Sequence, residues 1–140
     1  MYTILLYFLL SAYVVPNQYP QLTIKIENIE VVEGYIRIGV FNASDTFLKK
    51  SSTFKKYKIA VEDSIETIII DDLPKGEYAF ILYHDKNSDG KMNRKFIGIP
   101  KEPYGFSNNV RPKLSKPTFE ACKFHLEDNL VMQITLGYYK

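Results

Sequence analysis

Hydrophobic and polar residues alternate along most of the chain beyond residue 21. In the first such segment, Leu22, Ile24 and Ile26 are separated by Thr23 and Lys25. Alternation with a period of two is typical of a strand that buries one face. Seven segments of this kind, separated by turn-forming residues, lie at 22–27, 35–41, 57–61, 65–70, 78–83, 122–126 and 130–136. They predict an all-β, two-sheet antiparallel sandwich, in which the last two strands form a hairpin.

Two longer segments do not follow this alternation. Residues 44–56 place apolar side chains among lysines, and Ser44 or Asp45 could cap a helix there. This segment predicts a short helix or a turn-rich loop, and no other helix is expected. Residues 84–117 show little periodicity and contain many Asn, Asp, Gly and Pro residues. Loops of this length are uncommon in compact domains and usually carry function, so candidate chemistry is expected in the 84–117 loop.

The N-terminal segment differs in composition from the rest of the chain. Residues 1–20 contain no charged side chain, and residues 2–15 are almost entirely apolar. That run is shorter than the roughly 20 residues needed for a membrane-spanning helix, and it is typical of a secretory signal. A membrane anchor and a buried first strand are the alternatives. We therefore expect a signal segment at 1–20 and one β-sandwich domain at 21–140, exported to the periplasm, the cell envelope or the extracellular space.

Composition limits the function classes further. The chain has 140 residues, a net charge of +2 and a single cysteine. This length suits one domain, and this charge does not by itself indicate a nucleic-acid or membrane-surface partner. One cysteine cannot form an internal disulfide, and Cys122 is expected to be a core residue.

The first part of the long loop has a pattern suited to a cation. Residues 85–93, DKNSDGKMN, carry oxygen-bearing side chains at alternate positions, followed by Gly90. Alternate side chains can converge on one hard cation, and glycine permits the sharp bend. Phe96 occupies the place of the bidentate EF-hand glutamate, so the segment is not an EF-hand. It is either a weak calcium site or a set of turns in which side chains bond to the backbone. The candidate ligands are Asp85, Asn87, Asp89, the Lys91 carbonyl, Asn93 and Glu102.

The second part of the loop interleaves aromatic, glycine and amide residues between prolines. Tyr104 and Phe106 could stack on a sugar or peptide, with Asn108 and Asn109 as hydrogen-bonding groups. Alternatively, the aromatic rings close the open end of the sandwich and hold the loop down. Both interpretations make these four residues the candidate ligand-binding or loop-bracing set.

Three motifs carry a resemblance to a known family. The runs LPKGEYAFILYHDKNSDGKMN, FIGIPKEPYGFSNN and PTFEACKF resemble the bacterial domain-of-unknown-function 2141 family, over roughly residues 22–138. The resemblance implies an exported β-sandwich and no particular activity. LPKGEY is also similar to a turn and strand of transthyretin-like and carboxypeptidase-regulatory-like domains, which are commonly accessory domains. The expected fold is thus a seven-stranded antiparallel immunoglobulin/transthyretin-like β-sandwich.

Catalytic signatures such as Gly-x-Ser-x-Gly and His-Glu-x-x-His do not occur in the sequence. A pair formed by His84 and Asp85 is the one candidate for catalysis, although His84 and His125 also suit polar positions at sheet edges. A basic stretch could contact an anionic glycan or nucleic acid, but neighbouring acidic residues favour a solvated face. Its lysines are Lys49, Lys50, Lys55, Lys56 and Lys58.

These observations predict an exported, non-catalytic accessory module that binds a ligand or cation through the 84–117 loop. Calcium is the one candidate cofactor, and no other is expected. The partner is not identified by the sequence; a cell-envelope glycan or protein is the candidate, and no nucleic acid and no membrane span in the mature chain are expected. The alternatives are a small envelope hydrolase that uses His84 and Asp85, and a purely structural envelope component. Thermal melting with calcium tests the cation site, and activity assays test the hydrolase. Glycan binding distinguishes the binding module from the structural component.

Overall fold

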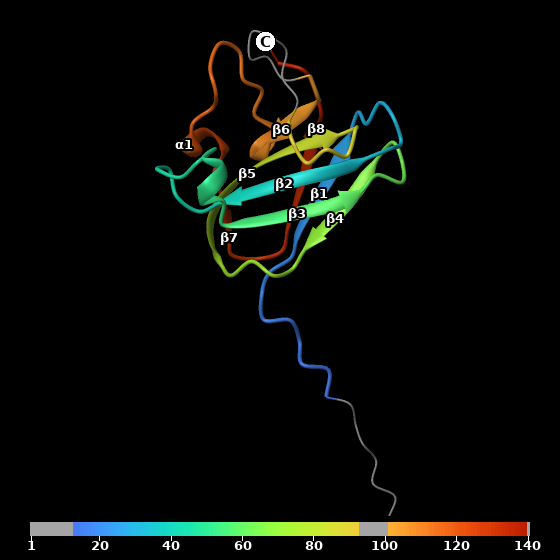
Figure 1. Cartoon of the computed structure of the whole chain (residues 1–140). Helices are drawn as coiled ribbons and strands as arrows, with labels where there is room; N and C mark the ends of the chain where they lie inside the picture. The colour runs from blue at the N-terminus through green and yellow to red at the C-terminus, as the bar shows by residue number, and fades with distance from the viewer. Residues whose placement is uncertain (1–12, 93–100, 140) are drawn as a thin grey trace, which may run out of the picture.

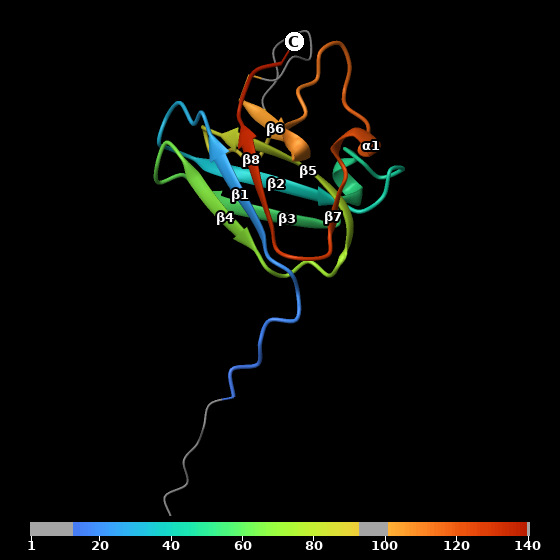
Figure 2. The ribbon, with the colours of Figure 1, turned by 180° about the vertical axis from the view of Figure 1, so that it is seen from behind.

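The computed structural model describes residues 13–92 and 101–139, which form two facing β-sheets (Figures 1 and 2). One sheet has the strand order β4–β1–β8, and the other has the order β3–β2–β5–β6, with β7 paired to β5. The strands are β1 (Leu22–Glu27), β2 (Tyr35–Phe41), β3 (Lys55–Ala60), β4 (Glu66–Ile70), β5 (Gly76–Asp85), β6 (Tyr104–Phe106), β7 (Phe124–Leu126) and β8 (Leu130–Thr135). The helical elements are η1 (Lys50–Ser52), η2 (Ser107–Asn109) and α1 (Phe119–Cys122).

The structure confirms the predicted all-β sandwich and corrects its details. The described residues form eight strands, not seven, because β6 lies within the segment predicted to be one long loop. The strands are also not all antiparallel, since β1 pairs with β8 in parallel. The predicted hairpin of the last two strands is wrong: β7 pairs with β5 in one sheet, whereas β8 pairs with β1 in the other. The turn between β7 and β8 therefore passes from one sheet to the other.

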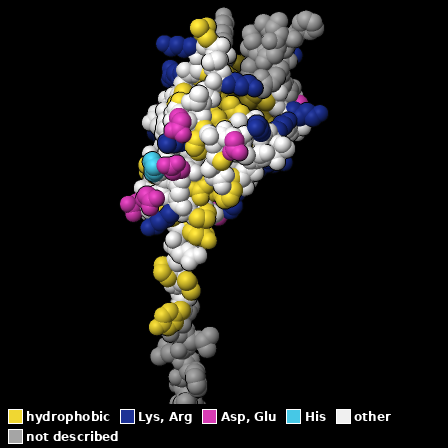
Figure 3. Space-filling view, turned by 90° about the vertical axis from the view of Figure 1, so that its left-hand side faces the viewer, with side chains coloured by type: hydrophobic (Ala, Val, Ile, Leu, Met, Phe, Trp, Pro, Cys, Tyr) yellow, Lys and Arg dark blue, Asp and Glu magenta, His cyan; other side chains and the backbone are white. Residues whose placement is uncertain are grey.

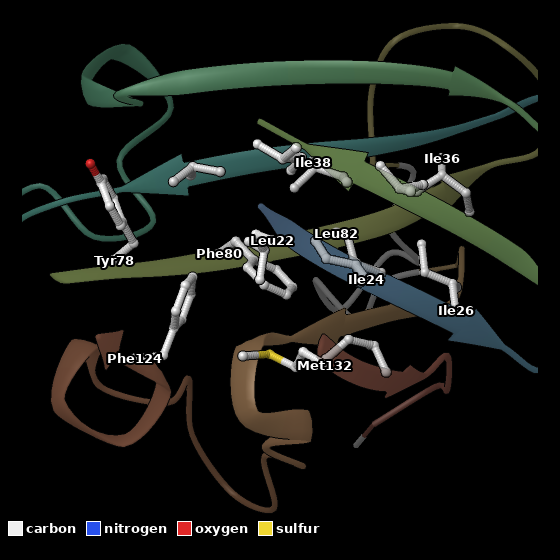
Figure 4. Close-up of a cluster of buried hydrophobic side chains, with 14 of the residues drawn as sticks. Leu22, Ile24, Ile26, Ile36, Ile38, Tyr78, Phe80, Leu82, Phe124 and Met132 are labelled. Carbon is white, nitrogen blue, oxygen red and sulfur yellow. The ribbon is translucent and has the colours of Figure 1, made fainter. Parts of the chain in front are cut away.

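The main core lies between the two sheets and follows from the alternation in the sequence. Leu22, Ile24 and Ile26 of β1 are fully buried, and they face Phe80 and Leu82 of β5 (Figure 4). Fully burying a side chain of this size contributes about 1.5–3 kcal/mol. The core therefore holds the sheets together without a disulfide, and the 84–117 loop starts from a rigid strand.

A second apolar cluster lies on the outer face of the larger sheet. Ala79 of β5 is buried there, on the face opposite Phe80, since successive strand residues point to opposite faces. Loop aromatics cover it, and the rings of Tyr104 and Phe106 meet edge to face with centroids 5.7 Å apart. Phe119 and Cys122 of α1 complete this outer cluster. Cys122 is thus a buried residue, as expected, but it lies in a short helix and not in a strand.

The sequence predicts either a short helix or a turn-rich loop at residues 44–56. In the structure, the segment between β2 and β3 is the turn-rich loop. Its helical part is η1, which has three residues, and β3 already begins at Lys55. Phe47 and Leu48 pack against the outer cluster. This segment therefore extends the apolar cover over one end of the larger sheet.

The signal prediction falls mainly on residues 1–12, which lie outside the described residues. Tyr13, Val14 and Val15 are 93%, 85% and 83% exposed, on a segment that extends from the sandwich (Figures 1 and 3). Within 13–92 and 101–139, no helix has the length and apolar character of a membrane span.

Candidate functional site

The candidate site begins where β5 ends, at Asp85. Its carboxylate is fully buried and accepts hydrogen bonds from the backbone nitrogens of Asp89 (3.2 Å) and Gly90 (2.9 Å). The Arg37 Nε atom of β2 donates a third bond, of 2.6 Å, to the Asp85 Oδ2 atom. A buried carboxylate requires such partners, and hydrogen bonds from charged donors are among the strongest in proteins. Asp85 thereby fixes the loop to the sheet.

Residues 86–91 form a tight turn around this carboxylate. Ser88 and Gly90 have positive φ values of 59° and 77°, which bring the chain back toward Asp85. The Asp89 Oδ1 atom accepts a bond of 2.9 Å from the Lys91 backbone nitrogen, and the Asn87 Nδ2 atom donates to the Asp89 Oδ2 atom over 3.2 Å. Asp85, Asn87 and Asp89 of the alternating set are thus connected by hydrogen bonds within one turn.

Glu102 reaches the same place from the far side of the loop. Its side chain is buried, and its Oε1 atom accepts a hydrogen bond of 3.2 Å from the Lys86 backbone nitrogen. One oxygen from each of Asp85, Asp89 and Glu102 lies within 4.8 Å of the other two. The structure thus brings together three predicted ligands from both ends of the loop. Asn93, another predicted ligand, lies outside the described residues.

A polar clasp connects the turn to the C-terminal segment. The Lys86 Nζ atom donates to the Tyr138 hydroxyl over 2.8 Å, and that hydroxyl donates to the Glu30 carboxylate over 3.2 Å. The hydrogen bond with Tyr138 raises the pKa of Lys86, so the ammonium stays charged at neutral pH. The turn is therefore anchored at Asp85 and, through Lys86, at the C-terminal segment.

Comparison with known families gives one result. The family model described as an uncharacterized protein conserved in bacteria (DUF2141) matches residues 24–134. The chain belongs to the DUF2141 family. No curated protein and no solved structure matches it significantly. Membership agrees with the resemblance seen in the sequence and assigns no chemistry to the loop.

In this DUF2141 protein, the aromatic and amide residues predicted for ligand contact hold the loop in place. Tyr104 and Phe106 are only 8% and 3% exposed, so their ring faces pack internally. Asn108 and Asn109 have positive φ values, and their side chains bond to the Lys123 carbonyl (2.8 Å) and the Thr135 nitrogen (3.0 Å). Of the two interpretations of these residues, the geometry favours loop bracing.

His84 lies in the interior, which corrects the sheet-edge position suggested by the sequence. It is fully buried, and its Nε2 atom lies 2.6 Å from the Glu33 carbonyl oxygen. Among the buried side-chain nitrogen and oxygen atoms of the described residues, its Nδ1 atom is the one without a hydrogen-bond partner. As successive residues of β5, His84 and Asp85 point to opposite faces of the sheet. Asp85 therefore cannot orient His84 as the hydrolase hypothesis requires. His125, with a side chain 62% exposed, faces solvent as expected.

Arg37 is the site residue that sequence reasoning missed. It belongs to β2, 48 positions before Asp85. Its proximity depends on the antiparallel register that places Tyr35 opposite Asp85 and Arg37 opposite Tyr83. No local motif encodes that register, so the sequence offered no direct signal for this ion pair.

Proposed function

We propose that this protein is an exported, non-catalytic accessory module whose loop binds a divalent cation, calcium, between β5 and β6. The single observation that carries the proposal is the convergence of the Asp85, Asp89 and Glu102 oxygens within 4.8 Å. Residues 104–109 are otherwise braced by their own packing, so the cation would stabilise the turn that follows β5.

The donor set favours calcium over transition metals. All three convergent groups are carboxylates, which suit hard cations, whereas zinc and copper sites usually include histidine or cysteine. Calcium accepts six to eight oxygens in variable geometry, so turn carbonyls and the Asn87 side chain suit it better than the strict octahedron of magnesium. Partly exposed sites in extracellular modules bind calcium with dissociation constants of about 10⁻⁴–10⁻³ M, and we expect that range here.

The competing interpretation is a turn that needs no cation. The Asp85 carboxylate already accepts bonds from Arg37 and two backbone nitrogens, as a purely structural carboxylate would. The two interpretations differ in what calcium does to stability. A ligand that binds only the folded state stabilises it by an amount set by its concentration and dissociation constant, whereas a cation-free turn is indifferent to calcium.

The test is thermal unfolding in 10 mM calcium, in 10 mM magnesium and in chelator. For the dissociation constants above, calcium should add about 1.4–2.7 kcal/mol to the free energy of unfolding. Asp89→Asn should lose most of this increment, because one charged ligand is removed. Asp128→Asn changes an exposed carboxylate in the turn between β7 and β8, and should keep the increment. An unfolding midpoint that is the same in calcium and chelator for the wild-type protein would refute the cation site.

Export is the second part of the proposal and has a separate test. It is supported by the uncharged residues 1–20 and the apolar run within them. Fractionation of bacterial cells that express the full chain, followed by N-terminal sequencing, should find a shortened protein outside the cytoplasm. Full-length protein confined to the cytoplasmic fraction would contradict export without affecting the cation site.

A further inference from the structure

The outer face of the larger sheet carries basic side chains where loops do not cover it. Ile36 and Ile38 of β2 point into the core, so Tyr35 and Arg37 point outward. Arg37 lies opposite Lys58 of β3, and Lys56 is the next outward position on that strand. Figure 1 looks onto β2 and β3 from this side. We call Tyr35, Arg37, Lys56 and Lys58 the basic face.

The lysines of the basic face are available to a ligand. Lys56 and Lys58 are exposed, and within 13–92 and 101–139 neither ammonium lies within 4.0 Å of a carboxylate. By contrast, Lys55, whose side chain lies on the other side of β3, bonds to Asp72 over 2.6 Å. Of the basic face, Arg37 is paired with Asp85, whereas Lys56 and Lys58 have no carboxylate partner among the described residues.

Neighbouring segments give this face a defined border. Gly39 lies opposite Lys56 and has no side chain. The Thr53 methyl group lies 3.5 Å from the position that a Cβ atom of residue 39 would occupy. At the other end, the Arg37 guanidinium lies 3.5 Å from the corresponding position at Gly90. The basic face thus lies between the segment that precedes β3 and the turn that follows β5.

We propose that the basic face binds an acidic polysaccharide. Lys56 and Lys58 are about 7 Å apart along the strand, so two carboxylates of one polymer could pair with them at once. Ammonium and guanidinium groups are strong donors to carboxylates. The arrangement is thus complementary in charge to an extended polyanion that lies along β3.

The aromatic group of this face argues against single-stranded nucleic acid. Proteins that bind it without sequence preference stack bases on free aromatic rings. The Lys58 ammonium lies 4.1 Å from the centroid of the Tyr35 ring and occupies one face of it. Tyr35 therefore positions a cation and does not offer that face to a base.

The lysines of β3 also have an alternative role that needs no ligand. Exposed lysines on an edge strand protect it from pairing with another chain and so from aggregation.

The experiment measures binding of the full chain to polygalacturonate by isothermal titration and by affinity electrophoresis, in chelator and at low salt. We expect binding that weakens as salt is added, because the contacts are between charges. Lys56→Gln with Lys58→Gln should weaken it by about tenfold or more, since two charged donors are lost. The matched control, Lys113→Gln with Lys116→Gln, removes two exposed lysines from another loop and should change the affinity by less than about twofold.

Each alternative gives a different result. Equal weakening by both double variants would show that net charge, not the basic face, drives binding, and would overturn the proposal. If the wild-type protein does not bind polygalacturonate, the proposal is also overturned, and the remaining role of the lysines is to protect the edge strand from aggregation. Tighter binding of an oligothymidylate of similar charge would assign the face to nucleic acid instead. Because chelator is present throughout, none of these results depends on the calcium site.

Discussion

At the scale of single residues, Gly34 determines whether the candidate site can form. It has a φ of +70°, and a Cβ atom there would overlap the Asp85 carbonyl oxygen and would lie 2.9 Å from that of Lys86. Backbone oxygens at this distance cannot move away cheaply, because Asp85 is held by β2 and by its own turn. The absence of a side chain at position 34 is therefore a requirement of the loop that follows β5.

Gly34→Ala should lower the free energy of unfolding by about 2–4 kcal/mol, from the left-handed backbone and the steric overlap together. Urea denaturation measures this change. Gly39→Ala, in the strand β2 that follows Gly34, is the matched control, because its φ is not positive and its nearest neighbour is a methyl group at 3.5 Å. That variant should lose less than about 1 kcal/mol. Equal losses in the two variants would show that the Gly34 contact does not limit the fold.

At the scale of elements, Ser107 fills a gap in the pairing of β5. Along one edge, β5 pairs with β7 at residues 76–78 and with β6 at residues 81–83. Phe80 lies between these two short strands, and its backbone nitrogen donates to the Ser107 Oγ atom over 3.0 Å. The same hydroxyl donates to the Cys122 carbonyl over 2.6 Å. One buried side chain thus joins β5, η2 and α1.

Ser107→Ala should lower the free energy of unfolding by about 1–3 kcal/mol, because it leaves the buried Phe80 nitrogen without an acceptor. Hydrogen exchange should report faster exchange of the Phe80 amide than in the wild-type protein. Ser115→Ala, at an exposed position, is the control and should be neutral. Unchanged stability together with unchanged exchange at Phe80 would mean that a water replaces the hydroxyl.

Alternation in the sequence located the longer strands because one face of each is buried, as in β1 and β8. It could not locate β6, whose three residues are buried without alternation. Nor could it show that β1 and β8 pair in parallel, since period-two patterns carry no strand direction. Asp85 and Asp89 were identified because they share one turn. Arg37 and the burial of His84 depend on the register of β2 and β5, which only the folded sheet defines.

At the scale of the whole molecule, β5 connects two apolar layers. Its inward residues Phe80 and Leu82 belong to the core between the sheets, whereas Ala79 belongs to the outer cluster with Cys122 and Phe119. The first and last long strands, β1 and β8, pair with each other, so the ends of the domain are also joined. This arrangement predicts that the two layers unfold together.

Cys122 provides a direct measurement of that cooperativity. Its side chain is fully buried, and burial raises the pKa of the thiol to about 11, so little reactive thiolate exists at neutral pH. The folded protein should therefore react with a thiol reagent only through opening, and the opening free energy should equal the global value from urea denaturation. Ser115→Cys adds an exposed thiol that should react at once, as a control. The raised pKa also predicts that stability falls as pH rises from about 9 to 11, because the unfolded thiol ionises first. A Cys122 thiol that reacts far faster than global unfolding allows would show that α1 and the loop open independently of the sandwich.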